Sequence, residues 1–222
     1  MNIKENLSQI KSQLPEYVNL VAVSKTKPVS DLMEAYEAGQ RIFGENKIQE
    51  MAEKWEEMPK DIQWHMIGHV QRNKVKYMAE FVNLIHGVDS LKLLKEIDKQ
   101  AKKHDRLIDC LFQIKIAEED SKFGLSEENV KTIIASSEFS ELENIKIIGL
   151  MGMATFTDNM QQVENEFKFL KSAFNNLKRH TTLNFKLETL SMGMSGDYKL
   201  AIDCGSNMVR VGSSIFGSRN YN

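Results

Sequence analysis

The sequence contains few of the residues that mark specialised protein classes. Only 2 of its 222 residues are cysteine and 3 are proline. Cys110 and Cys204 form no CxxC pair, so they predict reduced thiols in a cytosol rather than a metal site or a disulfide framework. The longest apolar run, residues 147–154, is too short to span a bilayer, and the amino terminus lacks the apolar core of a signal peptide. We therefore expect a cytoplasmic protein without a membrane partner.

An excess of one charge is also missing. The 29 lysines and arginines nearly balance the 31 aspartates and glutamates, which leaves a formal net charge of -2. Without a general positive field, a nucleic-acid partner is not expected, and a small molecule is the default ligand. The balance of 41% hydrophobic and 27% charged residues excludes disordered, collagen-like and coiled-coil classes. The charged helical segments contain no obvious dimer patch, so we expect a monomer.

Short β-rich runs alternate along the chain with longer stretches whose apolar residues recur every three or four positions. The eight candidate strands begin near Leu20, Arg41, Ile62, Phe81, Asp109, Ile145, Lys186 and Met208. This alternation predicts an α/β protein, a single (β/α)8 TIM barrel with an extra amino-terminal helix, in one domain over residues 1–222. An open doubly wound sheet is the alternative. It usually has a glycine-rich first turn, whereas SKTKP follows the first strand here.

The helical stretches carry recognisable start and stop signals. Pro28 suits the first turn of a helix after the first strand, and Gly39 can end that helix. A cap from Asp89 or Ser90 is expected for the fourth helix and one from Ser126 for the fifth. The longest helix is expected over residues 158–179.

The active site of a TIM barrel lies at the carboxyl ends of its strands, so polar residues there are candidates for function. The candidates, taken in chain order, are Lys25, Asn46, His65, Ser191, Ser195, Arg210, Gly212 and Ser213. Lys25 follows an apolar strand that would carry its amine to a desolvated mouth, where a lysine readily becomes a Schiff-base nucleophile. A lysine that merely faces solvent is the alternative, and Lys27 is assigned to the rim.

Two segments with glycine and serine, SMGMS at residues 191–195 and RVGSS at residues 210–214, follow the last two strands. In TIM barrels these two loops often bind phosphate, and here glycine permits close backbone approach while serine supplies hydrogen bonds. Ordinary turn chemistry is the alternative. Arg210 alternates with Val209 and Val211 and should point into the barrel, where it needs a ligand nitrogen or a carboxylate as partner.

Two further candidates, His65 and Asn46, and their neighbours lie near the expected mouth. His65 and His69 are four apart, but the strand and glycine turn expected there argue against a metal site, and His65 is interpreted as a barrel-lining donor. The Asn46 side-chain amide could hydrogen-bond a hydroxyl group on the ring of a ligand. Its neighbour Glu45 could cap the following helix instead of facing the mouth.

A Schiff-base lysine, a phosphate cradle and an inward arginine together suggest pyridoxal 5'-phosphate as the cofactor. The sequence resembles the YggS/PROSC family of pyridoxal phosphate homeostasis proteins over essentially its whole length. The matching segments are AVSKTKP (22–28), FGEN (43–46), WHMIG (64–68), SKFG (121–124), GLM (149–151), SMGMS (191–195) and MVRVG (208–212). The resemblance implies a barrel like the amino-terminal domain of alanine racemase, with Lys25 in an internal aldimine. It also implies phosphate contacts from Ser191 or Ser195 and from Gly212 and Ser213, with Arg210 toward the pyridine nitrogen.

The first hypothesis is a non-catalytic carrier that acts in intracellular pyridoxal phosphate homeostasis and could pass the cofactor to apoenzymes. Racemase-like enzymes add a β-domain that supplies a second acid or base, and only residues 218–222 follow Gly217 here. An arginine at the pyridine nitrogen would also weaken the ring as an electron sink. The second hypothesis is an amino-acid racemase or lyase that uses Lys25 and His65 as bases. The third is a Schiff-base aldolase without cofactor.

Overall fold

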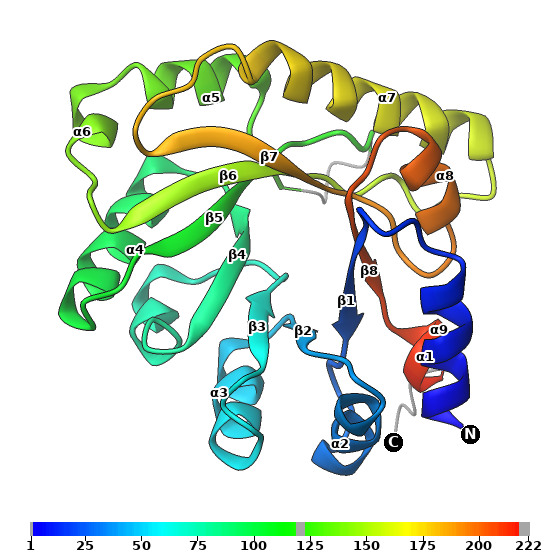
Figure 1. Ribbon diagram of the computed structural model, residues 1–222. Coiled ribbons are helices and arrows are strands. Elements are labelled where there is room, and N and C mark those ends of the chain that lie inside the picture. Colours follow the sequence, from blue (N-terminus) through cyan, green and yellow to red (C-terminus); the bar gives the residue numbers. More distant parts are fainter. Residues whose placement is uncertain (1, 119–122, 218–222) are drawn as a thin grey trace.

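The computed structural model describes residues 2–118 and 123–217, and within them eight parallel strands close into a barrel (Figure 1). The strands are β1 (Asn19–Val23), β2 (Ile42–Glu45), β3 (Gln63–Met66), β4 (Val82–Val88), β5 (Ile108–Gln113), β6 (Ile145–Met151), β7 (Phe185–Ser191) and β8 (Met208–Val211). Each strand pairs with the next in sequence, and β8 pairs back to β1 with Val21 opposite Arg210. The predicted TIM barrel is confirmed, and the β1–β8 pairing rules out the open sheet.

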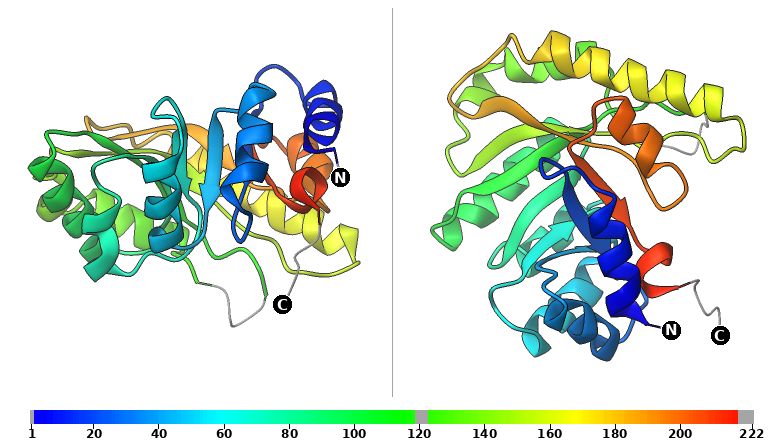
Figure 2. Two further views of the ribbon diagram at one scale, coloured as in Figure 1. Left: turned by 90° about the horizontal axis from the view of Figure 1, so that it is seen from below. Right: turned by 45° about the vertical axis from the view of Figure 1, so that its right-hand side comes forward.

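Helices connect successive strands and cover the outside of the barrel (Figure 1). They are α1 (Ile3–Ser12), α2 (Val29–Glu37), α3 (Ile48–Glu57), η1 (Arg72–Tyr77), α4 (Leu91–Lys103), α5 (Glu127–Ile134), α6 (Ser137–Ser140), α7 (Met160–Leu177), α8 (Tyr198–Asp203) and α9 (Ser213–Phe216). The expected extra helix, α1, lies beside α9, as Figure 2 also shows. The Asn6 side-chain amide donates to the Ile215 carbonyl at 3.0 Å, which ties the two ends of the described chain together.

Local sequence explains where the helices begin. Ser90 caps α4 through the Leu93 amide, and Ser126 caps α5 in a reciprocal capping box. The longest helix starts at Met160, two residues later than expected, because the Asn159 side chain accepts from its first turn. The third connection differs from the α-helix expected for each unit. It contains the 3₁₀-helix η1, in which only Val75 is buried, so no apolar stripe is available to hold a longer α-helix against the barrel.

The apolar residues form two packed regions. The larger one lies between the outer face of the barrel and its helices. The smaller one fills the barrel interior with Val21, Leu84, Leu111, Met151 and Met208. Because strand side chains alternate between the two faces, each strand contributes every second residue to this interior and can present polar groups at its carboxyl end.

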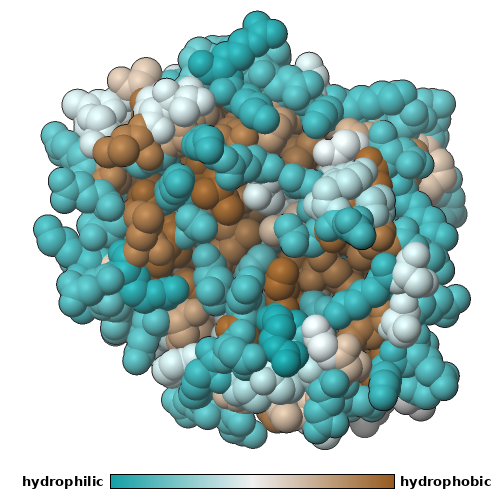
Figure 3. Space-filling model, viewed as in Figure 1, coloured by the Kyte–Doolittle hydropathy of each residue, from teal (hydrophilic) through white to brown (hydrophobic). Residues whose placement is uncertain are grey.

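The outer surface is mainly polar. Figure 3 shows hydrophilic residues over most of one face, with hydrophobic residues gathered toward its middle. None of the helices in residues 2–118 and 123–217 is long and apolar enough to cross a membrane. The first two residues of the SKFG segment, Ser121 and Lys122, and residues 218–222 lie outside the described residues.

Candidate functional site

A cavity of about 630 Å³ opens at the carboxyl ends of the strands, within the range of roughly 300–1,000 Å³ typical of small-molecule sites. Most of the residues predicted from the sequence line it, and they come from β8 itself and from the segments after β1, β2, β7 and β8. These are Lys25, Asn46, Ser195, Arg210, Gly212 and Ser213. The other two candidates, His65 and Ser191, are buried beneath the cavity and are not part of its wall.

Lys25 lies in a tight turn directly after β1. The turn is closed by the Lys27 amide, which donates to the Ser24 carbonyl at 3.1 Å. Both Lys25 and Lys27 line the cavity. The apolar strand β1 therefore ends with the Lys25 side chain at the mouth of the barrel, as the sequence suggested. Thr26, between them, has a φ of 63°, a left-handed conformation that is unusual for a β-branched residue.

Asn46 presents an unsatisfied acceptor at the cavity. Its Oδ1 atom is buried and has no hydrogen-bond partner among the described residues. Its backbone is fixed by close packing, since a Cβ atom on Gly68 would overlap the Asn46 carbonyl oxygen. A buried acceptor of this kind costs free energy unless a ligand donor reaches it.

The segments after β7 and β8 meet at one wall of the cavity. The Gly212 amide donates to Ser195 Oγ at 3.2 Å, which leaves the Ser195 hydroxyl hydrogen available for a ligand oxygen. Gly212 also packs closely on β1, because a Cβ atom there would lie 3.0 Å from the Val23 carbonyl oxygen. Ser213 begins α9, and the first N–H groups of a helix have no acceptor within it. Hydroxyl and amide donors therefore converge at this wall.

Arg210 places a buried positive charge at the cavity. Arg210 is 4% exposed, and its guanidinium donates to Ser191 Oγ at 2.7 Å and to the Gly152 carbonyl at 3.1 Å. Both acceptors are neutral. Burial lowers the pKa of Arg210 to about 10, with a smaller opposing effect from Asp197, so the group is still a cation at neutral pH. Its remaining donors suit an electron-rich atom of a ligand.

A chain of buried hydrogen bonds continues beneath Arg210. Ser191 Oγ lies 3.1 Å from His86 Nδ1, and His86 Nε2 lies 3.1 Å from His65 Nδ1. Burial lowers the pKa of His65 to about 3. Burial, together with the adjacent His65 ring and the charge of Arg210, lowers the pKa of His86 well below its usual value. Both imidazoles are therefore neutral. Since Arg210 can only donate, the pattern that satisfies each group runs from Arg210 through the Ser191 hydroxyl to His86 and then to His65.

Two features of this end of the barrel were missed or misread in the sequence. His86 was not singled out, although it has the same strand parity as the interior residue Leu84. Glu45 does not cap α3, whose N-cap is Lys47 without a side-chain bond. The Glu45 side chain is instead fully buried, and its Oε1 atom accepts from Ser24 Oγ and Lys54 Nζ, both at 2.7 Å, while Oε2 has no partner among the described residues.

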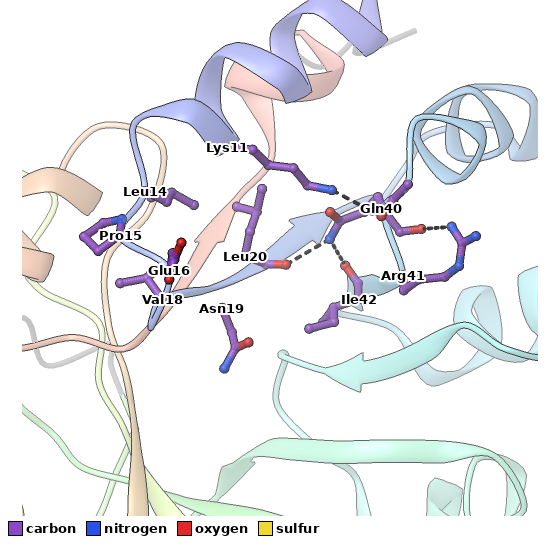
Figure 4. A pocket seen from close by; sticks show the side chains of 11 residues that line it. Lys11, Leu14, Pro15, Glu16, Val18, Asn19, Leu20, Gln40, Arg41 and Ile42 are labelled. Carbon is purple, nitrogen blue, oxygen red and sulfur yellow. Dashed lines mark hydrogen bonds between the residues drawn. The ribbon is translucent and has the colours of Figure 1, made fainter.

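A second hollow, of about 390 Å³, lies at the opposite end of the barrel, where β1 and β2 begin (Figure 4). Three of its polar side chains, those of Lys11, Gln40 and Arg41, bond to backbone carbonyls of the protein itself. Gln40 donates to the Leu20 and Ile42 carbonyls at 2.9 and 2.7 Å, and Lys11 donates to the Gly39 carbonyl at 3.2 Å. Burial and the neighbouring charge of Arg41 lower the pKa of Lys11. These bonds tie the two strands and α1 together.

Comparison with known proteins identifies the family. A family model described as alanine racemase, N-terminal domain, matches residues 1–220. The chain belongs to this family. It is 38% identical to the pyridoxal phosphate homeostasis protein of Haemophilus influenzae, over 100% of this chain and 98% of that protein. It is 35% identical to the protein of the same name from Escherichia coli K12, over 99% of this chain and 98% of that protein.

Solved structures agree with this assignment. PipY of Synechococcus elongatus PCC7942, which is 34% identical, matches with a TM-score of 0.90 without PLP and 0.88 with PLP bound. Each match covers 97% of this chain and 100% of PipY. Alanine racemase of Clostridium difficile 630 matches with a TM-score of 0.77 at 19% identity, and this chain covers 57% of it. That second likeness shows a shared fold.

Proposed function

We propose that this protein binds pyridoxal 5'-phosphate in the carboxyl-end cavity and acts in pyridoxal phosphate homeostasis. The observation that carries the proposal is the meeting of Lys25, the orphaned Asn46 acceptor and the donors at residues 195 and 212–213 in one cavity. Support comes from the relatives, which are named for pyridoxal phosphate homeostasis, and from PipY, which has been solved with PLP bound.

The residues present fit this cofactor. The cofactor would supply an aldehyde that bonds covalently to the Lys25 amine. Asn46 Oδ1 would accept from the ring hydroxyl and so gain the partner that it lacks. Ser195 and Ser213 offer hydroxyl and amide donors to phosphate oxygens, while the Gly212 amide orients the Ser195 hydroxyl and Gly212, without a side chain, lets a phosphate approach the backbone.

Arg210 would donate to the ring nitrogen, which must then act as an acceptor and stay unprotonated. The other two predicted site residues would act indirectly. Ser191 orients the Arg210 guanidinium, and His65 ends the hydrogen-bond chain that supports Ser191 through His86.

The site favours a non-catalytic role over a racemase or lyase. His65, the second base that the enzyme hypothesis invokes, lies beneath the cavity wall and stays neutral at physiological pH. The positive charge of Arg210 opposes protonation of the ring nitrogen, which limits the electron demand that amino-acid chemistry needs. The proposal includes a single cofactor-binding domain, a monomeric state, a cytoplasmic location and transfer of the cofactor to PLP-dependent apoenzymes.

A titration tests cofactor binding. Cofactor-free protein is mixed with pyridoxal 5'-phosphate, and the visible absorbance of the adduct is followed in the wild type and in Lys25→Ala and Lys27→Ala. We expect the absorbance change in the wild type and in Lys27→Ala and its loss in Lys25→Ala. No absorbance change in the wild type, or an undiminished change in Lys25→Ala, would overturn the proposed site.

A second assay separates the carrier from the enzyme. The loaded protein is incubated in deuterium oxide with D- and L-amino acids, and exchange at the α-carbon is measured. We expect exchange far below the turnover of about 10 per second that is typical of enzymes. Exchange at such enzymatic rates would reject the non-catalytic role while leaving cofactor binding intact.

A further inference from the structure

A buried cluster of charged side chains lies directly behind the Lys25 turn. Lys54, on α3, places its ammonium 2.7 Å from Glu45 Oε1 and 2.7 Å from Glu50 Oε1. The side chain of Lys54 is 7% exposed, that of Glu45 is fully buried and that of Glu50 is 21% exposed. None of these three residues lines the cavity, so the proposed cofactor site does not use them directly.

This cluster bonds to the backbone on both sides of Lys25. On the amino-terminal side, the Ser24 carbonyl accepts from Lys54 Nζ at 2.8 Å, and the Ser24 hydroxyl donates to Glu45 Oε1 at 2.7 Å. On the carboxyl-terminal side, the Thr26 amide donates to Glu50 Oε1 at 2.6 Å. Lys25 is therefore held between two residues that one charged cluster fixes.

The turn needs such support because its backbone is strained. Thr26 occupies a φ of 63°, where the branched Cβ of threonine is disfavoured and glycine is the usual residue. A strained residue of this kind persists only where its surroundings hold it in place. The Glu50 bond to the Thr26 amide and the Lys54 bond to the Ser24 carbonyl are the contacts that supply this constraint.

The arrangement is more specific than a link between β2 and α3 requires. An ion pair between Glu45 and Lys54 would connect the two elements without Glu50 and without any bond to the turn. Here a single Glu50 oxygen accepts from both Lys54 and the Thr26 amide, which couples the buried charge to the conformation of the turn.

We propose that Lys54 and Glu50 are positioning residues for Lys25, holding its turn in the conformation that points the amine into the cavity. This inference rests on the proposed function, since it assigns these residues a role in covalent bonding at Lys25. It predicts that loss of the Glu50 bond slows adduct formation without unfolding the protein, because Glu50 is partly exposed and Lys54 keeps Glu45 as its partner.

The test measures the rate of adduct formation with pyridoxal 5'-phosphate, together with the melting temperature, in Glu50→Ala and Glu50→Gln. Glu53→Ala serves as the matched control because Glu53 is an exposed glutamate on the same helix. We expect the rate to fall at least tenfold in Glu50→Ala. It should stay within threefold of the wild type in Glu50→Gln, whose amide oxygen can still accept from Thr26, and in Glu53→Ala.

A second substitution distinguishes positioning from a general structural role. Thr26→Gly removes the strain, so the double variant Thr26→Gly/Glu50→Ala should recover most of the lost rate even though Glu50 is absent. An unchanged rate in Glu50→Ala, or a double variant as slow as Glu50→Ala, would overturn the inference. Either result leaves the proposed function standing, because that function fails only if the wild type forms no adduct or if Lys25→Ala forms it equally well.

Discussion

The two ends of the barrel both carry a hollow lined by cationic and amide side chains, but they differ in how those groups are satisfied. At the amino ends of the strands, Lys11 and Gln40 bond to backbone carbonyls and Arg41 pairs with Asp61 at 2.9 Å. At the carboxyl ends, Asn46 has a buried oxygen without a partner among the described residues, and Arg210 bonds to neutral acceptors.

The difference shows that a hollow with cations is not by itself a ligand site. Polar groups whose hydrogen bonds are complete within the protein stabilise the fold, whereas a buried group left incomplete at a cavity wall, such as Asn46 Oδ1, is available to a ligand. The same eight strands form both ends, so the distinction arises from the residues at the carboxyl ends of the strands and in the loops that follow them.

The largest expected effect concerns acid stability. Histidine ordinarily titrates near pH 6.5, whereas the pKa of His65 is lowered to about 3 and that of His86 well below 6.5. Unfolding therefore takes up protons, so the stability present above pH 6.5 is lost as the pH falls toward 3. For His65 this amounts to about 1.4 kcal/mol per pH unit, or about 2–3 kcal/mol between pH 6.5 and 4.5, and His86 adds a loss in the same direction.

Denaturant unfolding across this pH range measures the slope. His86→Asn should lose part of the pH dependence, while His104→Asn, at the exposed C-cap of α4, should keep it. An equal slope in the wild type and in His86→Asn would show that the buried pair does not govern acid stability.

The next effect contrasts two arginines, one at each end. Arg210→Met should weaken pyridoxal 5'-phosphate binding about 100-fold, because a charged hydrogen bond contributes up to about 3 kcal/mol. Arg41→Met removes a cation that is paired with Asp61 and should leave the affinity within about threefold. Equilibrium titration of both variants with pyridoxal 5'-phosphate measures the two affinities. Equal losses of affinity would contradict the proposed difference between the two ends of the barrel.

The amino end should respond in stability instead. Gln40→Met removes the donor shared by the Leu20 and Ile42 carbonyls and should lower the free energy of unfolding by about 2 kcal/mol. Cofactor affinity should not change. A loss of affinity in this variant, measured on protein that is still folded, would mean that the amino end contributes to the site.

The smallest effect is expected at the phosphate wall. Ser195→Ala removes one hydroxyl donor and should weaken binding about tenfold, equivalent to about 1.4 kcal/mol. Exposed Ser140, at the end of α6, provides the control Ser140→Ala with unchanged affinity. Isothermal titration with pyridoxal 5'-phosphate and with pyridoxal separates the variants, since Ser195→Ala should lose affinity only for the phosphorylated form.

Much of the fold could be predicted because each strand of a parallel barrel is a short apolar run bounded by helical patterns. Strand starts, the Ser90 and Ser126 caps and the extra helix α1 all have local signals. The connection at η1 could not be anticipated, since its single buried residue leaves no periodic pattern. Local signals are sufficient where neighbouring residues determine the structure.

The site was harder to predict where it depends on contacts between distant segments. Lys25 and Arg210 follow from strand ends and parity, both of which are visible in one segment. His86 and His65 meet only because β3 and β4 are neighbours, and Lys54 reaches Glu45 only after α3 folds back on β2. A sequence shows that such side chains are polar but does not show that they are buried together.

The account's central claim is that covalent binding occurs at the carboxyl end through Lys25. Its most direct test is borohydride reduction of the protein loaded with pyridoxal 5'-phosphate, followed by peptide mass spectrometry. We predict one dominant modified peptide, with the reduced adduct on Lys25. An adduct on Lys11 at the amino end, or adducts spread evenly over the lysines with Lys25 unmodified, would contradict the account.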